Sequence, residues 1–191
     1  FSPNDLVVWR ANSIFYKESE TIDWIDNFKQ NDLLWDIGAN VGVFSLYAAS
    51  KKNRVISFEP SPGNYYILSK NIEINEFDNL ISAYPIAIND ISILDNFFME
   101  TTSLGSALSN FGSATNWKGE QMNFSYKQST ISYSIDDFID IYNLEIPNHI
   151  KIDVDGNENK VLIGAKKTLK NENLKTILIE LDTNKKDTYL E

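Results

Sequence analysis

A short run of small and acidic residues, Asp36-Ile37-Gly38-Ala39-Asn40-Val41-Gly42, follows the apolar segment 33–35 and precedes a helix-like stretch over 43–50. Two glycines in a turn between a strand and a helix allow positive φ angles and let the backbone approach a ligand without an intervening Cβ. The start of the following helix also offers backbone N–H groups that have no partner within the helix. The spacing therefore predicts a cradle for a nucleotide-type cofactor.

The residues around the two glycines narrow the choice of cofactor. The next apolar run ends at Glu59, about 20 residues further on, where an acidic residue of a βαβ unit can accept both hydroxyls of a ribose. Asn40 occupies the place where a dinucleotide site needs a glycine against the pyrophosphate, and Asp36 would repel phosphate oxygens but suit an ammonium group. S-adenosylmethionine has an ammonium group and a ribose but no phosphate. The alternative is an ordinary strand-turn-helix whose glycines serve only packing.

Length and charge restrict the class of protein. At 191 residues the chain can bury one sizeable core, and we expect a single domain over 1–191. The net charge of −10 disfavours nucleic acid as a partner, because affinity for a phosphate backbone depends on clustered cations. No apolar run approaches the ~20 residues that span a bilayer, and no charged-then-apolar leader is recognisable at the start. We therefore expect a soluble, cytoplasmic protein without a membrane partner.

The pattern of apolar runs predicts the fold. Five runs of strand type, nearly continuous in apolar residues as in parallel strands buried on both faces, cover 33–37, 54–58, 81–88, 150–154 and 176–181. Helix patterns lie over 22–28, from 61 to at least 72, and over 156–169. The second is opened by Ser61-Pro62, and the third has Val161, Leu162, Ala165 and Leu169 facing the sheet. This alternation predicts an α/β fold with a doubly wound, mostly parallel sheet of the Rossmann-like class. A ligand would then bind at the carboxyl end of the first strand.

An insertion between the third and fourth strands interrupts this alternation. It contains a hairpin arm over 93–99, a Gly-, Ser- and Asn-rich loop over 101–119 and an alternating strand over 130–133. We predict that the loop is a mobile cover whose Phe111 and Trp117 close over a sugar ring. The alternative is a passive surface excursion or a dimer contact. The predicted order is an N-terminal segment (1–30), a cofactor-binding half (31–89), the insertion (90–134) and an acceptor-side half (135–191). Any further antiparallel edge strands are expected to be absent or to lie beyond residue 191.

With these elements placed, the chain resembles the FkbM family of S-adenosylmethionine-dependent methyltransferases over 31–181. The resemblance rests on the turn at 36–42, on Phe58-Glu59-Pro60 with Asn64, Asn71 and Asn75, on the segment 84–88, and on the stretch 150–158 around Asp153-Val154-Asp155-Gly156. It implies methyl transfer to oxygen, commonly a hydroxyl of a sugar or another secondary metabolite. The chain departs from the family in having Asp155 where a glutamate is usual.

The resemblance implies that the glycine turn holds the methionine end of the cofactor and that Glu59 holds its ribose. We expect Ala87 and Asn89 to flank the adenine at the end of the third strand, although an ordinary turn explains Asn89 equally well. The complete expected cofactor set is Asp36, Gly38, Ala39, Asn40, Gly42, Glu59, Pro60, Ala87 and Asn89. Gly42 is expected to tolerate no β-branched residue, because a Cβ there would intrude on the cofactor.

Asp153 and Asp155 are the expected catalytic residues, since they follow the fourth strand at the edge where the acceptor must bind. A carboxylate whose pKa is raised by burial can take the proton of a hydroxyl, and Asp153 is the expected base. The structural alternative is that Asp153 caps the next helix or pairs with Lys151. A divalent cation held by these residues with Glu180 and Asp182 is a weaker hypothesis, and no metal site is expected. His149 is expected to be structural.

The expected acceptor is a small hydroxylated molecule such as a glycan. Two other classes of protein stay open at this stage. A nicotinamide-dependent oxidoreductase would share the fold, but the chain lacks the G-x-G-x-x-G turn that such an enzyme needs. A non-catalytic Rossmann-like binding domain would keep the sheet without needing both glycines and Glu59.

Overall fold

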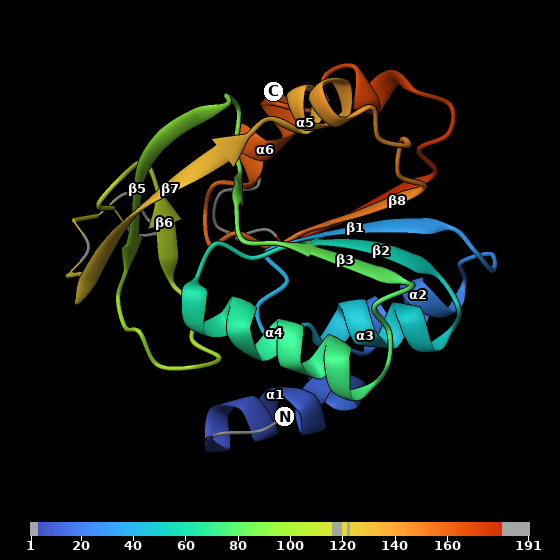
Figure 1. Ribbon diagram of the computed structural model, residues 1–191, viewed down its shortest axis with the longest axis horizontal. Coiled ribbons are helices and arrows are strands. Elements are labelled where there is room, and N and C mark those ends of the chain that lie inside the picture. Colours follow the sequence, from blue (N-terminus) through green and yellow to red (C-terminus); the bar gives the residue numbers. More distant parts are fainter. Residues whose placement is uncertain (1–3, 116–119, 122, 181–191) are drawn as a thin grey trace.

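Five parallel strands form the central sheet of the computed structural model, which describes residues 4–115, 120–121 and 123–180. Their order is β3-β2-β1-β8-β9 (Figure 1). The strands are β1 (Leu33–Ile37), β2 (Arg54–Phe58), β3 (Ile81–Tyr84), β8 (His149–Ile152) and β9 (Thr176–Ile179). All five residues of β1 are buried, as expected of a strand covered on both faces. The predicted doubly wound α/β fold is confirmed.

Helices cover both faces of this sheet (Figure 1). One face carries α2 (Ser19–Asp26), α3 (Val43–Ser50) and α4 (Pro62–Ile74), and the other carries α5 (Ile135–Tyr142), α6 (Glu158–Ile163) and the 3₁₀ helix η1 (Thr168–Lys170). Alternate residues of β1 serve the two cores: Leu34 packs with α2 to α4, whereas Trp35 and Ile37 pack with α5 and α6. None of the helices among the described residues is long and apolar enough to cross a membrane.

A smaller sheet projects from the end of the central sheet where the parallel strands terminate (Figure 1). Its strands are β4 (Ala87–Ile88), β5 (Ile93–Met99), β6 (Ser109–Phe111) and β7 (Tyr126–Tyr133), in the order β4-β7-β5-β6. The hairpin arm 93–99 is therefore confirmed, and its partner strand begins four residues earlier than the predicted 130. The insertion is a folded sheet that lies next to the carboxyl ends of the central strands.

Two predicted elements are wrong in their extent. The run 81–88 is not one strand: β3 ends at Tyr84, and β4 pairs with β7 in the second sheet. Pro85 lies between them and has no N–H with which to continue the ladder. The helix over 156–169 is likewise divided into α6 and η1. Val161 and Ala165 are buried as predicted, but Leu169 is exposed and does not face the sheet.

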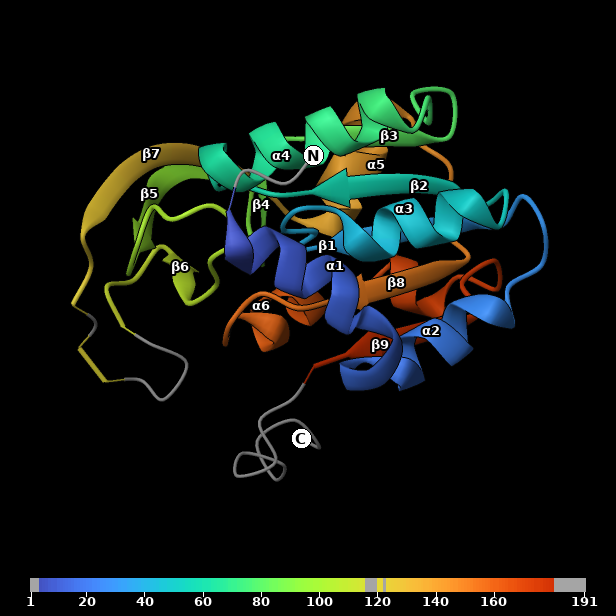
Figure 2. The ribbon, with the colours of Figure 1, turned by 90° about the horizontal axis from the view of Figure 1, so that it is seen from below.

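The N-terminal helix α1 (Asp5–Lys17) has no counterpart among the predicted elements. Asn4 caps it by accepting a hydrogen bond from the Val7 backbone N–H at 2.9 Å. The helix packs against α2 and α3. In Figure 2 it runs from the side of the smaller sheet toward α2. It brings the start of the chain close to the glycine turn.

Candidate active site

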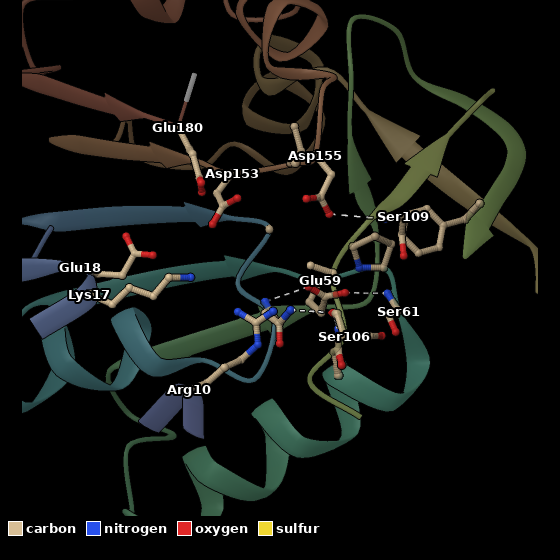
Figure 3. Close-up of a pocket in the computed structure, with 17 residues that line it drawn as sticks. Arg10, Lys17, Glu18, Glu59, Ser61, Ser106, Ser109, Asp153, Asp155 and Glu180 are labelled. Carbon is tan, nitrogen blue, oxygen red and sulfur yellow. Dashed lines mark hydrogen bonds between the residues drawn. The ribbon is translucent and has the colours of Figure 1, made fainter. Parts of the chain in front are cut away.

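A cavity of about 220 Å³ opens at the carboxyl ends of the central strands, where the glycine turn was predicted to bind a ligand (Figure 3). Its walls come from six parts of the chain: the glycine turn, the ends of β2, β8 and β9, and segments of α1 and of the insertion. Residues separated by more than 150 positions in the sequence thus meet at one site.

Gly38 begins the turn and requires the absence of a side chain. Its φ is +81°, and a Cβ there would overlap the backbone carbonyl oxygen of Asp153 at the end of β8. The N–H groups of Gly38 and Ala39 both donate to the Phe58 carbonyl at 3.0 Å, which fixes the turn against β2. Gly38 lines the cavity, whereas Ala39 is buried in the core between the sheet and the helices. Glycine is therefore required at this position by the close approach of the backbone after β8, and not by a ligand as we predicted.

Asn40 and Glu59 connect the turn to the end of β2. The Asn40 backbone N–H donates to Glu59 Oε2 at 2.8 Å, and the Ser61 N–H donates to Glu59 Oε1 at 2.8 Å. Burial raises the pKa of Glu59 to about 7, because the loss of solvent outweighs both hydrogen bonds. Each carboxylate oxygen accepts one N–H and retains capacity for another donor. Glu59 lines the cavity.

Gly42 and Asp36 do not line the cavity. The φ of Gly42 is +88°, but a Cβ there would meet the side chain of Leu68 on α4, so our reason for requiring glycine was wrong. Asp36 points toward α3, where its Oδ2 accepts from Ser45 Oγ at 2.5 Å. Its Oδ1 has no hydrogen-bond partner among the described residues, and burial raises its pKa. Gly42 therefore contacts α4 and Asp36 contacts α3, on the side of the turn away from the cavity.

We expect Gly42→Val to unfold the protein rather than to remove cofactor binding selectively. The substitution places a branched side chain in contact with Leu68 and forces a β-branched residue to positive φ, which together cost about 3 kcal/mol or more. Thermal unfolding followed by circular dichroism should give a much lower Tm. A variant with the parental Tm and no cofactor affinity would restore the original explanation.

The end of the cavity near Pro60 continues into a small apolar pocket of about 30 Å³. Ala87 lines this pocket together with Phe97 and Phe111 of the insertion. Asn89 does not: it is buried, and its N–H donates to the Tyr133 carbonyl at 2.9 Å. Of the two residues expected beside adenine, the structure thus brings only Ala87 to the site.

Asp153 and Glu180 are neighbouring carboxyl groups at the ends of β8 and β9. The buried Lys151 donates to Asp153 Oδ2 at 2.9 Å, and its ammonium lies 5.0 Å from the centre of the Phe44 ring. Burial acts to raise the pKa of Asp153, but Lys151 outweighs it and the pKa is lowered. The charge of Asp153, followed by burial, raises the pKa of Glu180 to about 7. The expectation of a raised pKa for Asp153 is therefore wrong, and its pairing with Lys151 is confirmed.

Asp155 has the electrostatic character that was expected of Asp153. Its Oδ2 accepts from the backbone N–H groups of Leu108 at 2.7 Å and Ser109 at 3.4 Å, both in the insertion. Burial and the charge of Asp153 raise the pKa of Asp155 to about 6. No hydrogen bond to its Oδ1 is present among the described residues. One oxygen of this carboxylate is thus fixed while the other is available in the cavity.

The insertion covers the cavity with residues 104–110, which are held by hydrogen bonds. The Ser106 carbonyl accepts from Asn40 Nδ2 at 2.8 Å and from Asn64 Nδ2 at 3.0 Å. Gly105 and Phe111 are buried, so our prediction that the loop buries little surface is wrong for this part of it. Phe111 packs with Ala87 and the hairpin arm and does not lie free to stack on a sugar. Trp117 lies outside the described residues.

Helix α1 and the residue after it supply cavity-lining side chains that the sequence did not lead us to expect. Arg10, Lys17 and the following Glu18 all line the cavity (Figure 3). Arg10 Nε donates to the Gly105 carbonyl at 2.6 Å, and Asn4 Nδ2 donates to the Leu104 carbonyl at 3.0 Å. The available signal was a capping Asn4 before an apolar run, which is enough to predict a helix but not its contact with the insertion.

Two further predictions concern metal and histidine. Within the described ranges, no group of three or more His, Cys, Asp or Glu side chains is arranged to hold a metal ion, and Asp182 lies outside those ranges. His149 lies at the amino end of β8, away from the cavity, where it stacks on Phe28 at 3.6 Å and hydrogen-bonds to Asp32 at 3.0 Å. Its structural role is as predicted.

The chain is similar to known methyltransferases. The family model described as "Methyltransferase FkbM domain" matches residues 36–189. Hexuronic acid methyltransferase AglP of Haloferax volcanii is 22% identical over 180 residues, which are 94% of this chain and 69% of that protein. Methyltransferase sdnD of Sordaria araneosa is 40% identical over 65 residues, which are 32% of this chain and 25% of that protein. The chain therefore spans a quarter of one curated relative and about two thirds of the other.

A solved structure supports the fold alone. Precorrin-6y C5,15-methyltransferase from Geobacter metallireducens GS-15 superposes with a TM-score of 0.50 at 12% identity, over 90% of this chain and 66% of that chain. The family match is the stronger finding, because it contains the glycine turn, Glu59 and the acidic ends of β8 and β9. On that basis the chain belongs to the FkbM family of S-adenosylmethionine-dependent methyltransferases.

Proposed function

We propose that the protein methylates a hydroxyl oxygen of a sugar or of another small hydroxylated metabolite. The observation that carries this proposal is the carboxylate of Asp155, which faces the cavity with one oxygen fixed by the insertion and the other available. A relative named as a hexuronic acid methyltransferase supports a sugar acceptor. The net charge of −10 supports a small acceptor over a nucleic acid.

The residues around the cavity fit the cofactor of the family. Glu59 retains hydrogen-bonding capacity for the ribose, the backbone of Gly38 lines the cavity where the methionine end would lie, and Ala87 with Phe97 offers an apolar wall for one edge of the adenine. When bound, S-adenosylmethionine supplies a methyl group on a positively charged sulfur. The acidic side chains at the ends of β8 and β9 complement that charge, and in a site shielded from water this complementarity is stronger than in bulk solvent.

Asp155 is the proposed general base, in place of Asp153. Lys151 holds Asp153 in the ionised form with a lowered pKa, which makes Asp153 a weak base. The pKa of Asp155 is about 6, closer to neutrality, where a base is both ionised and able to accept a proton. In this arrangement Asp155 takes the proton of the acceptor hydroxyl. Asp153 and Lys151 remain an ion pair with no net charge.

We expect Asp155→Asn to lower kcat by about 10²–10⁴-fold with little change in the affinity for S-adenosylhomocysteine. The parent rate should fall as the pH drops through about 6, because Asp155 becomes protonated, and this acid limb should be absent from the residual rate of the variant. Asp155→Glu restores a carboxylate and is the matched control, which should keep most of the activity. A variant Asp155→Asn with the parental rate and pH profile would show that another group is the base.

The acceptor itself is tested by product analysis. The protein is incubated with methyl-labelled S-adenosylmethionine and a panel of glycosides and uronic acids, and the products are examined by mass spectrometry before and after mild alkali. A methyl ether on a hydroxyl survives alkali, whereas a methyl ester on a carboxylate does not. Alkali-stable label on a sugar supports the proposal. Label that alkali removes would place the methyl group on a carboxylate and contradict the hydroxyl as the acceptor.

A further inference from the structure

The cavity contains many more acidic than basic groups. Among the described residues that line it, the carboxylates are Glu18, Glu59, Asp153, Asp155 and Glu180. The cations are Arg10 and Lys17, both from helix α1. Lys151 is close by but is paired with Asp153 and does not line the cavity. A ligand carboxylate in this site can therefore be neutralised only from α1, within the part of the chain that the structure describes.

Arg10 is better placed for this role than Lys17. In Figure 3 the Arg10 side chain reaches toward Glu59 and Ser106, whereas Lys17 lies further along the cavity beside Glu18. The Nε of Arg10 is fixed by the Gly105 carbonyl at 2.6 Å. Its two terminal nitrogens have no hydrogen-bond partner among the described residues. Lys17 lies over the ring of Trp9, with its ammonium 4.9 Å from the ring centre.

We propose that Arg10 binds the methionine carboxylate of the cofactor through the guanidinium nitrogens that have no partner. The planar guanidinium matches the geometry of a carboxylate, and an ionised pair of this kind forms stronger hydrogen bonds than neutral groups do. The inference rests on the proposed placement of the methionine end at the turn that begins with Gly38. It makes helix α1, which precedes the glycine turn in the sequence, a part of the cofactor site.

Arg10 then has two roles, which an experiment must separate. The Nε hydrogen bond to Gly105 holds the insertion over the cavity, and loss of that bond would weaken every ligand equally. Asn4 provides a matched comparison, because its Nδ2 holds the adjacent Leu104 carbonyl at 3.0 Å without lining the cavity. Asn4→Ser keeps an oxygen that can cap α1 and removes only the hydrogen bond to the insertion.

The test is calorimetric titration with S-adenosylhomocysteine and with its decarboxylated form, which keeps the ammonium group and lacks the carboxylate. The parent should bind S-adenosylhomocysteine about 10–100-fold more tightly than the decarboxylated form, as expected for charge-assisted hydrogen bonds. Arg10→Gln should bring the two affinities close together by weakening S-adenosylhomocysteine more than the decarboxylated form, because both ligands also lose the effect of the Nε hydrogen bond to Gly105. Arg10→Lys should keep part of the difference, and Lys17→Gln should keep all of it.

The contrary outcomes are distinct. Equal weakening of both ligands by Arg10→Gln, as expected for Asn4→Ser, would assign Arg10 to the insertion contact alone and overturn the inference. Unchanged binding of both ligands would overturn it as well. Loss of the difference in Lys17→Gln but not in Arg10→Gln would move the role to Lys17. A parent protein that binds neither ligand would overturn the proposed placement of the cofactor itself, on which the inference rests.

Discussion

Replacing Gly38 by alanine is expected to abolish cofactor binding and to destabilise the protein by about 3 kcal/mol or more. Two effects add at this position. A residue with a side chain is strained at a φ of +81°, and the new Cβ would overlap the Asp153 carbonyl oxygen. That oxygen belongs to the backbone at the end of a central strand and cannot rotate away. Calorimetry with S-adenosylhomocysteine and thermal unfolding measure the two consequences.

Gly112→Ala is the matched control for Gly38→Ala. Gly112 has a similar φ of +77°, but the nearest atom to its Cβ would be Asp95 Oδ2 at 3.5 Å, an ordinary contact. Its substitution therefore carries only the conformational strain, roughly 1–2 kcal/mol, and should leave cofactor affinity unchanged. If both alanine variants bind the cofactor equally well, the close approach of the turn to β8 has no part in forming the site.

The sequence was sufficient to predict the centre of the fold and to bring Gly38 and Glu59 to one cavity. The runs that became β1 and β2 are short, apolar and followed directly by turn residues, so local pattern and tertiary placement agree there. Glu59 was located because the end of a parallel strand is a fixed place relative to the preceding glycine turn. Both Gly38 and Glu59 line the cavity, as their spacing predicted.

The remainder depended on contacts that a sequence pattern does not contain. Gly42 has the same sequence signature as Gly38, and only the position of Leu68 shows that its missing side chain serves the core. Arg10 reaches the site because α1 packs across α2 and α3, a tertiary placement that its own periodicity does not encode. Asp153 and Asp155 are two residues apart, yet Lys151 pairs with the first and the insertion with the second. Their pKa values therefore move in opposite directions.

The site is built jointly by α1 and the insertion, although neither belongs to the central sheet. The carbonyl groups of residues 104–106 accept hydrogen bonds from three elements. The donors are Asn4 and Arg10 at α1, Asn40 in the glycine turn and Asn64 on α4. The same segment continues to Leu108, whose N–H donates to Asp155. One stretch of the insertion thus contacts both the cofactor side and the proposed base. Its position can couple cofactor binding to the orientation of that base.

The stability of the ligand-free protein should decrease as the pH rises from about 4.5 to about 7, in part because of Glu59. Burial raises its pKa from 4.5 in the unfolded chain to about 7 in the fold. A carboxyl group with a raised pKa stabilises the fold most below its unfolded pKa, and this contribution is lost as the pH rises to the folded pKa. For a shift of this size the loss is on the order of 1–3 kcal/mol. The parent Tm should therefore fall between pH 5.5 and pH 8.

Glu59→Gln should weaken S-adenosylhomocysteine binding by about 10–100-fold, because the charge-assisted hydrogen bonds expected from the ribose hydroxyls are lost. The same variant should show a smaller fall of Tm between pH 5.5 and pH 8 than the parent, since the amide does not titrate. Glu76→Gln replaces an exposed glutamate after α4 and is the control for both measurements. Because other titrating groups contribute equally to parent and variant, the difference between them isolates Glu59. A Glu59→Gln protein that binds as tightly as the parent would remove Glu59 from the ribose site. An unchanged pH dependence of Tm would show that the Glu59 carboxyl group is not the buried, neutralised group that the structure indicates.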